Sequence, residues 1–329
     1  METDSGQDIP ERGGRGQAGH VPVLLKEAID FLAVRRGGTY LDATVGLGGH
    51  SLAIAKRLGA PGHLIGFDKD PHALRTAQKV LAPVVGRQSS VVSEHLPEVQ
   101  RLTTNDQRLD WPTITLLHGS FAELGKDQEA AALDGILADL GVSSLQLEDA
   151  ARGFSFQADG PLDMRMNPMS GETAEQVVNR ISERELADVI YEFGEERRSR
   201  RIARAIVRSR PILTTKQLVD VISAAARPMK HERIHPATRT FQALRIFVNR
   251  ELDDLKALLE AAPRVLKPGG RLVVISFHSL EDRIVKDALR SGKGKYFGLL
   301  TKKPVTASEE EIASNPRARS AKMRAAERL

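Results

Sequence analysis

Two aspartates and a group of glycines are the first residues whose types and spacing suggest chemistry. The stretch LDATVGLGGH (41–50) places Asp42 just ahead of Gly46, Gly48 and Gly49, and the apolar run HLIGFD (63–68) ends on Asp68. Glycines let a ligand approach the backbone closely. An acid at the end of the second strand of an open α/β sheet can accept the hydrogen bonds of a ribose diol. The pattern predicts a nucleoside-binding loop shaped by Asp42 and Gly46.

The same loop departs from the common phosphate-binding motifs. The third glycine of a G-x-G-x-x-G fingerprint is replaced by Ser51, and no Lys-Ser or Lys-Thr pair follows the glycines as in a P-loop. Asp42 would repel a phosphate but could face a cationic amine or sulfonium. S-adenosylmethionine, which has no phosphate, therefore fits better than a dinucleotide. A tight turn in some other doubly wound protein is the alternative interpretation.

The elements that must position these residues alternate along the chain. Strands are predicted at 40–43, 63–68, 113–121, 133–141 and 271–277, and helices at 21–34, 50–58, 71–81 and 240–262. This alternation favours an α/β fold with a parallel sheet covered by helices on both faces. We interpret residues 82–112 as a long polar loop, 145–235 as a helical insert without strands, 301–329 as a charged tail and 1–18 as a disordered leader.

Composition excludes several classes of chemistry. The 329 residues include 48 basic and 43 acidic ones, a net charge of +5, and no cysteine. Without cysteine there is no disulfide, thiolate nucleophile or iron–sulfur cluster. The histidines lack metal-ligand spacing, so no metal is predicted. No apolar run approaches the roughly 20 residues of a membrane span, so we expect no membrane association and a cytoplasmic location.

Several longer blocks resemble one known family. They include GHVPVLLKEAIDFL, DATVGLGGHS, DLGVSSLQLEDAARGFSFQADGPLDMRM, HPATRTFQALRIFVNREL, KPGGRLVVISFHSLEDRIVK and NPRARSAKMRAAER. In this order, from about residue 19 to the C-terminus, the chain is similar to the RsmH (MraW) family, bacterial methyltransferases that modify N4 of one cytosine in the decoding centre of 16S ribosomal RNA. Residues 84–112 look longer and more polar than the corresponding link in the family.

The resemblance implies a class I, Rossmann-like methyltransferase domain (19–144 and 236–329) with 145–235 as a substrate-recognition insert. It implies S-adenosylmethionine as cofactor and 16S rRNA, within the small ribosomal subunit, as partner. The family's cofactor contacts fall on Gly48, Gly49, His50, Asp68, Phe121, Asp139 and Gln146. The residues themselves agree for most of these positions. A helix that begins at His50 presents free N–H groups to a carboxylate, and Phe121 could pack on adenine or simply in the core.

The acceptor side of the reaction is less defined by the sequence. Many amino-methyltransferases carry Asp/Asn-Pro-Pro-aromatic after the fourth strand; here the acid Asp139 is present but the prolines and the aromatic residue are not. Asp139 could hold the cofactor, the amine or both. Phe154 and Phe156 could flank a flipped base or anchor the insert. His278 could relay a proton, although a helix cap is the favoured interpretation.

Three basic stretches are candidates for RNA binding. Arg197, Arg201, Arg204 and Arg208 form a single stripe at helical spacing, with Ile202 and Ile206 opposite. Arg239 and Arg245 are the second candidate, and the segment NPRARSAKMRAAERL is the third. Phosphate contacts by such groups would supply affinity, whereas the alternative is a merely solvated face. Two other functions remain open: a nucleotide-dependent oxidoreductase, and a non-catalytic rRNA-binding assembly factor.

Overall fold

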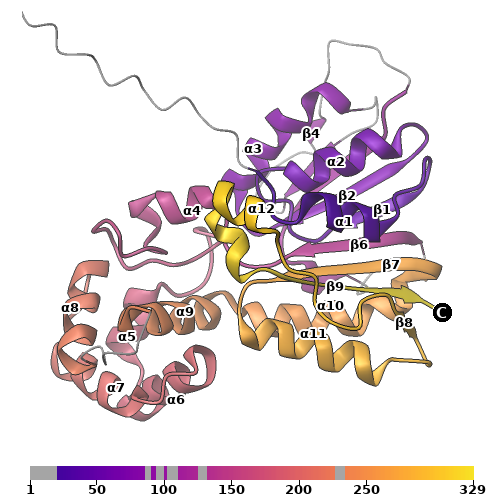
Figure 1. Cartoon of the computed structure of the whole chain (residues 1–329). Coiled ribbons are helices and arrows are strands. Elements are labelled where there is room, and N and C mark those ends of the chain that lie inside the picture. The colour runs from indigo at the N-terminus through magenta and orange to yellow at the C-terminus, as the bar shows by residue number, and fades with distance from the viewer. Residues whose placement is uncertain (1–20, 86–89, 94–99, 102–109, 125–131, 227–233) are drawn as a thin grey trace, which may run out of the picture.

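A nine-stranded sheet in the order β4-β3-β5-β2-β1-β6-β7-β9-β8 crosses the computed structural model (Figure 1). The structure describes residues 21–85, 90–93, 100–101, 110–124, 132–226 and 234–329. The predicted leader, residues 1–18, lies outside these ranges.

Five strands form the parallel centre of the sheet, and they correspond to the five strands predicted from the sequence. They are β1 (Thr39–Asp42), β2 (His63–Asp68), β5 (Thr113–His118), β6 (Leu133–Asp139) and β7 (Leu266–Ser276). Neighbours among them pair in parallel, with Asp42 opposite Leu137 and Asp68 opposite His118. Because parallel strands all end at the same edge, the carboxylates that terminate β1, β2 and β6 lie at one edge of the sheet.

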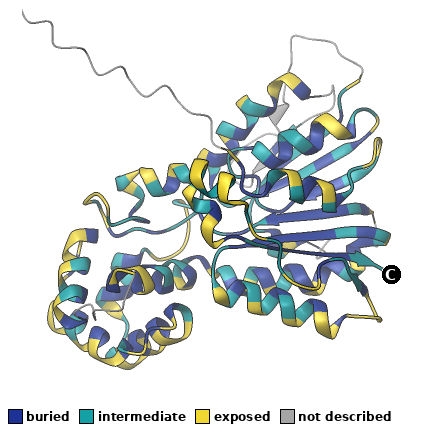
Figure 2. Cartoon of the chain, viewed as in Figure 1, coloured by how far each residue is buried: buried dark blue, intermediate teal, exposed yellow. Residues whose placement is uncertain are grey.

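Helices cover the sheet on both faces, as the alternation predicts. One face packs against α1 (Leu25–Leu32), α2 (Gly49–Leu58) and α3 (Pro71–Leu81), and the other against α10 (Glu251–Val265) and α11 (Ser279–Ser291). Side chains alternate between the faces, so Tyr40 is buried on the first and Leu41 on the second. Figure 2 shows the strands buried between helices whose outer faces are exposed.

The predicted loop at 82–112 instead contains sheet elements. After η1 (Ala82–Val84), strand β3 (Ser90–Ser93) pairs in parallel with β5, and β4 (Gln100–Arg101) pairs antiparallel with β3. Residues 86–89, 94–99 and 102–109 lie outside the described ranges. The polar composition of most of this stretch concealed the short apolar run that contains Val91, which is buried in the core.

The prediction of a charged tail from residue 301 is wrong. After β8 (Phe297–Leu299), the chain forms α12 (Glu309–Ser314), η4 (Pro316–Ser320) and β9 (Lys322–Arg328). Strand β9 inserts antiparallel between β7 and β8. Met323 and Ala325 are buried on one face and Ala326 on the other, while Arg324 pairs with Asp282 at 2.6 Å. Small apolar residues thus enter the core between basic ones.

The insert forms a helical unit beside the sheet, with a core of its own (Figure 1). Its elements are α4 (Ser144–Glu148), η3 (Ala150–Arg152), α5 (Ala174–Arg180), α6 (Glu183–Gly194), α7 (Ser199–Arg208) and α8 (Thr215–Ala225). Helix α9 (Pro236–Asn249) packs on α5, α6 and α8 and contributes Phe241 and Leu244 to the same core. The helix predicted at 240–262 is therefore two helices, which break at Arg250 with φ of 53°, and helical packing continues past residue 235.

Candidate functional site

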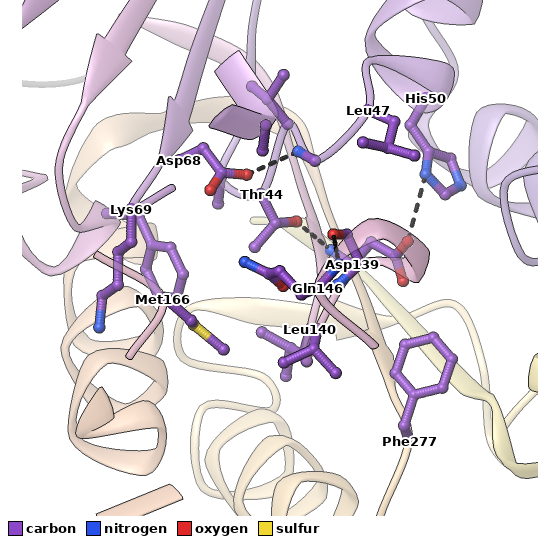
Figure 3. Close-up of a pocket in the computed structure, with 18 of the residues that line it drawn as sticks. Thr44, Leu47, His50, Asp68, Lys69, Asp139, Leu140, Gln146, Met166 and Phe277 are labelled. Carbon is purple, nitrogen blue, oxygen red and sulfur yellow. Dashed lines mark hydrogen bonds and ion pairs between the residues drawn. The ribbon is translucent and has the colours of Figure 1, made fainter. Parts of the chain in front are cut away.

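A cavity opens at the carboxyl edge of the parallel strands (Figure 3). The loop after β1, the ends of β2 and β6, and side chains from distant elements form its wall. Residues lining it include Pro22, Thr44, Gly46, Leu47, Gly49, His50, Asp68, Lys69, Phe121, Asp139, Leu140, Gln146, Met166, Phe277 and Arg317. Most of the residues predicted to bind a cofactor are thus brought together, whereas Asp42, Gly48 and His278 do not line the cavity.

Asp68 and Gly46 connect the ends of two strands. The Gly46 N–H donates to Asp68 Oδ2 at 2.7 Å, and the Asp70 N–H donates to Asp68 Oδ1 at 2.8 Å. Burial raises the pKa of Asp68 to about 7. Each carboxylate oxygen keeps a further acceptor site, so Asp68 is positioned rigidly while remaining able to accept hydrogen bonds from a ligand in the cavity.

The other two glycines allow close packing around the loop. Gly48 has φ of 85°, and a Cβ there would lie 3.1 Å from the Ala77 Cα of α3. Gly48 therefore allows α3 to approach and does not itself line the cavity. A Cβ on Gly49 would lie 2.3 Å from the Pro22 side chain. Its absence lets Pro22 form one wall of the cavity.

Asp42 is completely buried behind the loop and does not line the cavity. Its Oδ2 accepts from the Ser51 hydroxyl at 2.5 Å, and its Oδ1 accepts from the Thr44 N–H at 3.1 Å. Burial raises its pKa to about 6. Asp42 thus fastens the first turn of α2 to the end of β1, which agrees with shaping the loop but not with facing a cationic group.

Asp139 is the most unusual group in the cavity. Its N–H donates to Thr44 Oγ1 at 2.6 Å, and its Oδ2 lies 3.6 Å from His50 Nδ1 (Figure 3). Its Oδ1 is buried without a hydrogen-bond partner. Burial raises the pKa of Asp139 to about 8, against the opposing positive charge of Arg317. An unsatisfied buried acceptor is costly, so this oxygen is suited to a hydrogen-bond donor on a ligand.

Gln146 and Phe121 line the cavity but are held by the protein. The Gln146 side chain donates to Asp70 Oδ2 at 2.8 Å and accepts from the Ser143 N–H at 2.8 Å, closing a capping box at the start of α4. Phe121 begins η2 (Phe121–Glu123) and is largely buried. Both side chains can pack against a ligand, but the Gln146 amide already forms hydrogen bonds within the protein.

Three wall residues, Lys69, Met166 and Arg317, were not predicted from the sequence to line the cavity. Lys69 donates from Nζ to the Asn249 carbonyl at 2.7 Å, and the Met166 N–H donates to Asn249 Oδ1 at 2.7 Å. The end of α9 therefore places both side chains at the cavity (Figure 3). Arg317 belongs to a basic stretch that the sequence analysis assigned to RNA. All three positions depend on contacts between segments far apart in the chain.

The aromatic residues predicted to flank a base lie elsewhere. Phe154 is buried in the core of the insert. Phe156 packs against Phe241 and His235, with ring centroids 5.0 and 5.2 Å apart. Neither Phe154 nor Phe156 lines the cavity. In this structure both anchor the insert, which was the alternative interpretation.

His278 occupies a helix cap. Its Nδ1 accepts from the Glu281 N–H at 3.4 Å, and its Nε2 lies 3.1 Å from Glu281 Oε1. It precedes the first turn of α11 and is absent from the cavity wall. This geometry suits the capping role that the sequence favoured over a proton relay.

Arginines of the predicted RNA stripe are exposed on α7 and just before it. Arg201, Arg204 and Arg208 point outward, with Ile202 and Ile206 buried beneath them, and Arg197 is exposed ahead of the helix. Arg204 is partly engaged, because its Nε lies 3.2 Å from Glu183 Oε1. The stripe therefore exists as a surface, interrupted by one acid.

The two arginines of the second basic candidate lie in different environments. Arg239 is exposed and lies 3.8 Å from Glu196. Arg245, in contrast, is largely buried and forms two hydrogen bonds to the Glu251 carboxylate, at 2.8 and 2.9 Å. Burial is the largest single influence on the pKa of Arg245 and lowers it, but the charges of Glu251 and Glu281 and the hydrogen bond to Glu251 together outweigh burial, so the pKa is raised. Arg245 is thus committed to an internal ion pair, which contradicts its assignment to RNA.

Acidic side chains outnumber basic ones in the cavity wall. Five acids (Asp68, Asp139, Glu251, Asp254 and Glu281) and two bases (Lys69 and Arg317) line it, although Lys69 pairs with Asp254, and Glu251 pairs with Arg245 outside the wall. Such a lining disfavours a ligand rich in phosphate and suits one that carries a positive charge. Within the described ranges, no group of three or more potential ligands could hold a metal ion, and no helix is long and apolar enough to cross a membrane.

Comparison with known proteins gives consistent matches along the whole chain. The model of the MraW methylase family matches residues 17–329. Ribosomal RNA small subunit methyltransferase H of Koribacter versatilis is 66% identical, over 99% of each chain. The protein of the same name from Acidobacterium capsulatum is 60% identical, over 94% of this chain and 98% of the relative.

Proposed function

The chain belongs to the MraW methylase family, and from this premise we propose that it methylates N4 of one cytidine in the decoding centre of 16S rRNA. It is an S-adenosylmethionine-dependent rRNA methyltransferase of the class I fold. The specific cytidine, the decoding-centre location and the chemistry at the amine are part of the proposal. A substrate in the small ribosomal subunit would place the protein in the cytoplasm.

The cavity suits S-adenosylmethionine, which when bound supplies an electrophilic methyl group on a sulfonium. Asp68, with spare acceptor sites on both oxygens, would hold the ribose diol. The first turn of α2, at Gly49 and His50, would offer N–H groups to the methionine carboxylate. Phe121 would pack on the adenine. The surplus of acids in the wall supports a cationic cofactor over a dinucleotide, which disfavours the oxidoreductase alternative.

The unpaired Asp139 Oδ1 is the observation that carries the proposed chemistry. The exocyclic amine of cytosine is a poor nucleophile, because its lone pair is delocalised into the ring. Accepting one amine N–H at Asp139 would help to localise that lone pair and align the nitrogen. Since the chain has no cysteine, no covalent cysteine adduct could form. The methyl group would pass directly from the sulfonium to the amine, so that a C–N bond would form as the C–S bond breaks, with release of S-adenosylhomocysteine and of one amine proton to solvent.

The insert provides the surface for RNA. Arg197, Arg201 and Arg208 are exposed on or beside α7, with Arg204 among them. They would contact phosphates, which position RNA without reading its bases. No side chain of the described insert has been assigned to the target base, because Phe154 and Phe156 are packed internally.

A methyl-transfer assay tests the proposal. Purified protein with tritiated S-adenosylmethionine should label small ribosomal subunits that lack the modification, and nuclease digestion should yield N4-methylcytidine; naked 16S rRNA tests whether an assembled subunit is required. A protein that binds RNA without transferring a methyl group would instead be an assembly factor. NAD should show no saturable binding.

The role of Asp139 is tested by the Asp139→Asn variant, which preserves side-chain shape. We expect single-turnover methyl transfer to fall by more than the affinity for S-adenosylmethionine, because the amide is a weaker acceptor. Equal losses of both would make Asp139 a cofactor ligand only.

A further inference from the structure

Arg317 reaches the cavity from the segment that the sequence suggested was a tail. Hydrogen bonds hold that segment against the N-terminal residues that form one wall of the cavity. Asn315 donates from Nδ2 to the Val21 carbonyl at 2.9 Å, and Glu311 Oε1 accepts from the Leu24 N–H at 2.7 Å. Helix α12 and η4 therefore lie beside the start of α1, next to α4 (Figure 1).

The guanidinium of Arg317 is fixed in the loop that follows β6. Its Nη1 donates to Ser144 Oγ at 2.7 Å and its Nη2 donates to the Val142 carbonyl. Arg317 and Val142 both line the cavity. Because a guanidinium is planar and permanently charged, two directed contacts hold its charge in one place.

Charged groups from four elements face Asp139. Asp42 of β1 and Glu281 of α11 are acids, and both raise the pKa of Asp139. His50 of α2 lies 3.6 Å away. Arg317 of η4 is a permanent cation, and its charge lowers the pKa of Asp139 by more than either acid raises it. Burial favours a neutral Asp139, which could not serve as a charged acceptor, and the Arg317 charge offsets this effect only in part.

We propose that Arg317 is a positioning residue, whose fixed positive charge favours the carboxylate form of Asp139 that accepts a hydrogen bond from the acceptor amine. The proposal rests on the function proposed above for Asp139. It assigns to the C-terminal segment a task in the methyl-transfer site, in place of the RNA contact that its basic composition suggested.

The first test follows the titration of Asp139 itself, without cofactor or RNA. Protein labelled with ¹³C at aspartate side-chain carboxyls is titrated by NMR, and the Asp139 signal is identified by its loss in Asp139→Asn. In Arg317→Gln and Arg317→Met, we expect the midpoint to rise by about one pH unit, roughly tenfold less carboxylate at a given pH below it. Arg317→Lys should keep most of the wild-type midpoint. Arg319→Gln is the matched control, because Arg319 is exposed in the same segment.

The second test uses the pH dependence of single-turnover methyl transfer. In the neutral variants, the acid limb should move to higher pH, and raising the pH should restore much of the lost rate. A rate reduced equally at every pH, or an unmoved Asp139 midpoint in either folded neutral variant, overturns the proposal. If the midpoint moves as expected but wild-type protein transfers no methyl group, the proposed function fails while the link between Arg317 and Asp139 stands.

Discussion

Three carboxyl groups at the carboxyl ends of the parallel strands share a raised pKa. Burial raises the pKa of Asp42 to about 6, of Asp68 to about 7 and of Asp139 to about 8. Asp42 and Asp68 accept hydrogen bonds from backbone or hydroxyl donors, and Asp139 lines the cavity. Of the three, Asp139 has an ion-pair contact, which comes from His50. A cationic ligand in the cavity would favour the ionised forms, so cofactor binding and ionisation at this edge are coupled.

The raised pKa of Asp139 predicts how stability depends on pH. A carboxyl whose folded pKa exceeds its unfolded value of about 4 stabilises the fold at low pH, and this contribution is lost as pH rises toward 8. The side chain introduced in Asp139→Asn does not ionise, so the ligand-free variant does not lose this stability as pH rises. From pH 5 to 8.5, the free energy of unfolding of the variant should therefore increase relative to that of wild type by on the order of 2–4 kcal/mol. Urea unfolding at several pH values measures this. For the control Asp110→Asn, at an exposed site, the difference in free energy of unfolding from wild type should not change with pH. A difference for Asp139→Asn that also stays constant with pH would contradict the prediction.

Asp68 should dominate cofactor affinity. Asp68→Ala removes the acceptor proposed for the ribose and also the acceptor for two backbone N–H groups. Affinity for S-adenosylmethionine should fall by about 2–4 kcal/mol, as measured by titration calorimetry. Asp110→Ala, at an exposed site, should bind like wild type. Unchanged affinity in a folded Asp68→Ala protein would remove Asp68 from the ligand site.

At the scale of elements, α7 presents one buried and one basic face. Ile202 and Ile206 are completely buried, whereas Arg201 and Arg208 are exposed. This helix can therefore lose its outer charges without losing its packing. The same comparison excludes Arg245 of α9, whose charge is paired inside the protein.

Neutralising the α7 surface should weaken RNA binding through salt-dependent contacts. In Arg201→Gln/Arg208→Gln, the slope of log K against log salt should fall by about 0.7 to 0.9 for each lost phosphate contact. Cofactor affinity should stay constant, as should the choice of cytidine. The control is Arg57→Gln/Arg264→Gln, which removes two exposed arginines of α2 and α10. A wild-type slope in the α7 variant would move the predicted RNA contact to Arg239 or to exposed basic residues of the C-terminal segment such as Arg319.

At the scale of the whole molecule, the C-terminal segment completes both the sheet and the cavity. Strand β9 joins β7 to β8, and Arg324 pairs with Asp282 of α11. Arg317, only a few residues earlier, reaches the cavity. Residues 317–328 therefore complete both the sheet and one wall of the site.

Ending the chain at Leu300 should abolish folding. Removal of β9 would leave β8 without its strand partner and expose core residues on both faces of β7, at about 25 cal/mol for each Å² of apolar surface. We expect aggregation in size-exclusion chromatography and loss of a cooperative thermal transition. Lys302→Gln/Lys303→Gln/Arg319→Gln, which changes only exposed charges, should keep that transition. A folded truncated chain would show that β9 is dispensable.

The sequence by itself determined the layout of the parallel sheet and the chemical character of its edge. Apolar runs that end on Asp42, Asp68 and Asp139, each followed by a turn and a helix, are local patterns. Parallel pairing then brings strand ends together at one edge whatever the details of packing. The five central strands, and the place of Asp68 and Asp139 in the cavity wall, could be predicted for this reason.

Only the tertiary structure decided which groups meet across long stretches of chain. The basic residues of KMRAAER hide the alternation of Met323, Ala325 and Ala326, so β9 reads as a tail until β7 and β8 are seen on either side of it. Charge in a sequence likewise does not reveal its partner: Arg245 turns inward to Glu251, Arg201 faces outward, and Arg317 lines the same cavity as Asp139. Local patterns repeat with the period of a strand or a helix, whereas these contacts depend on how separate elements pack.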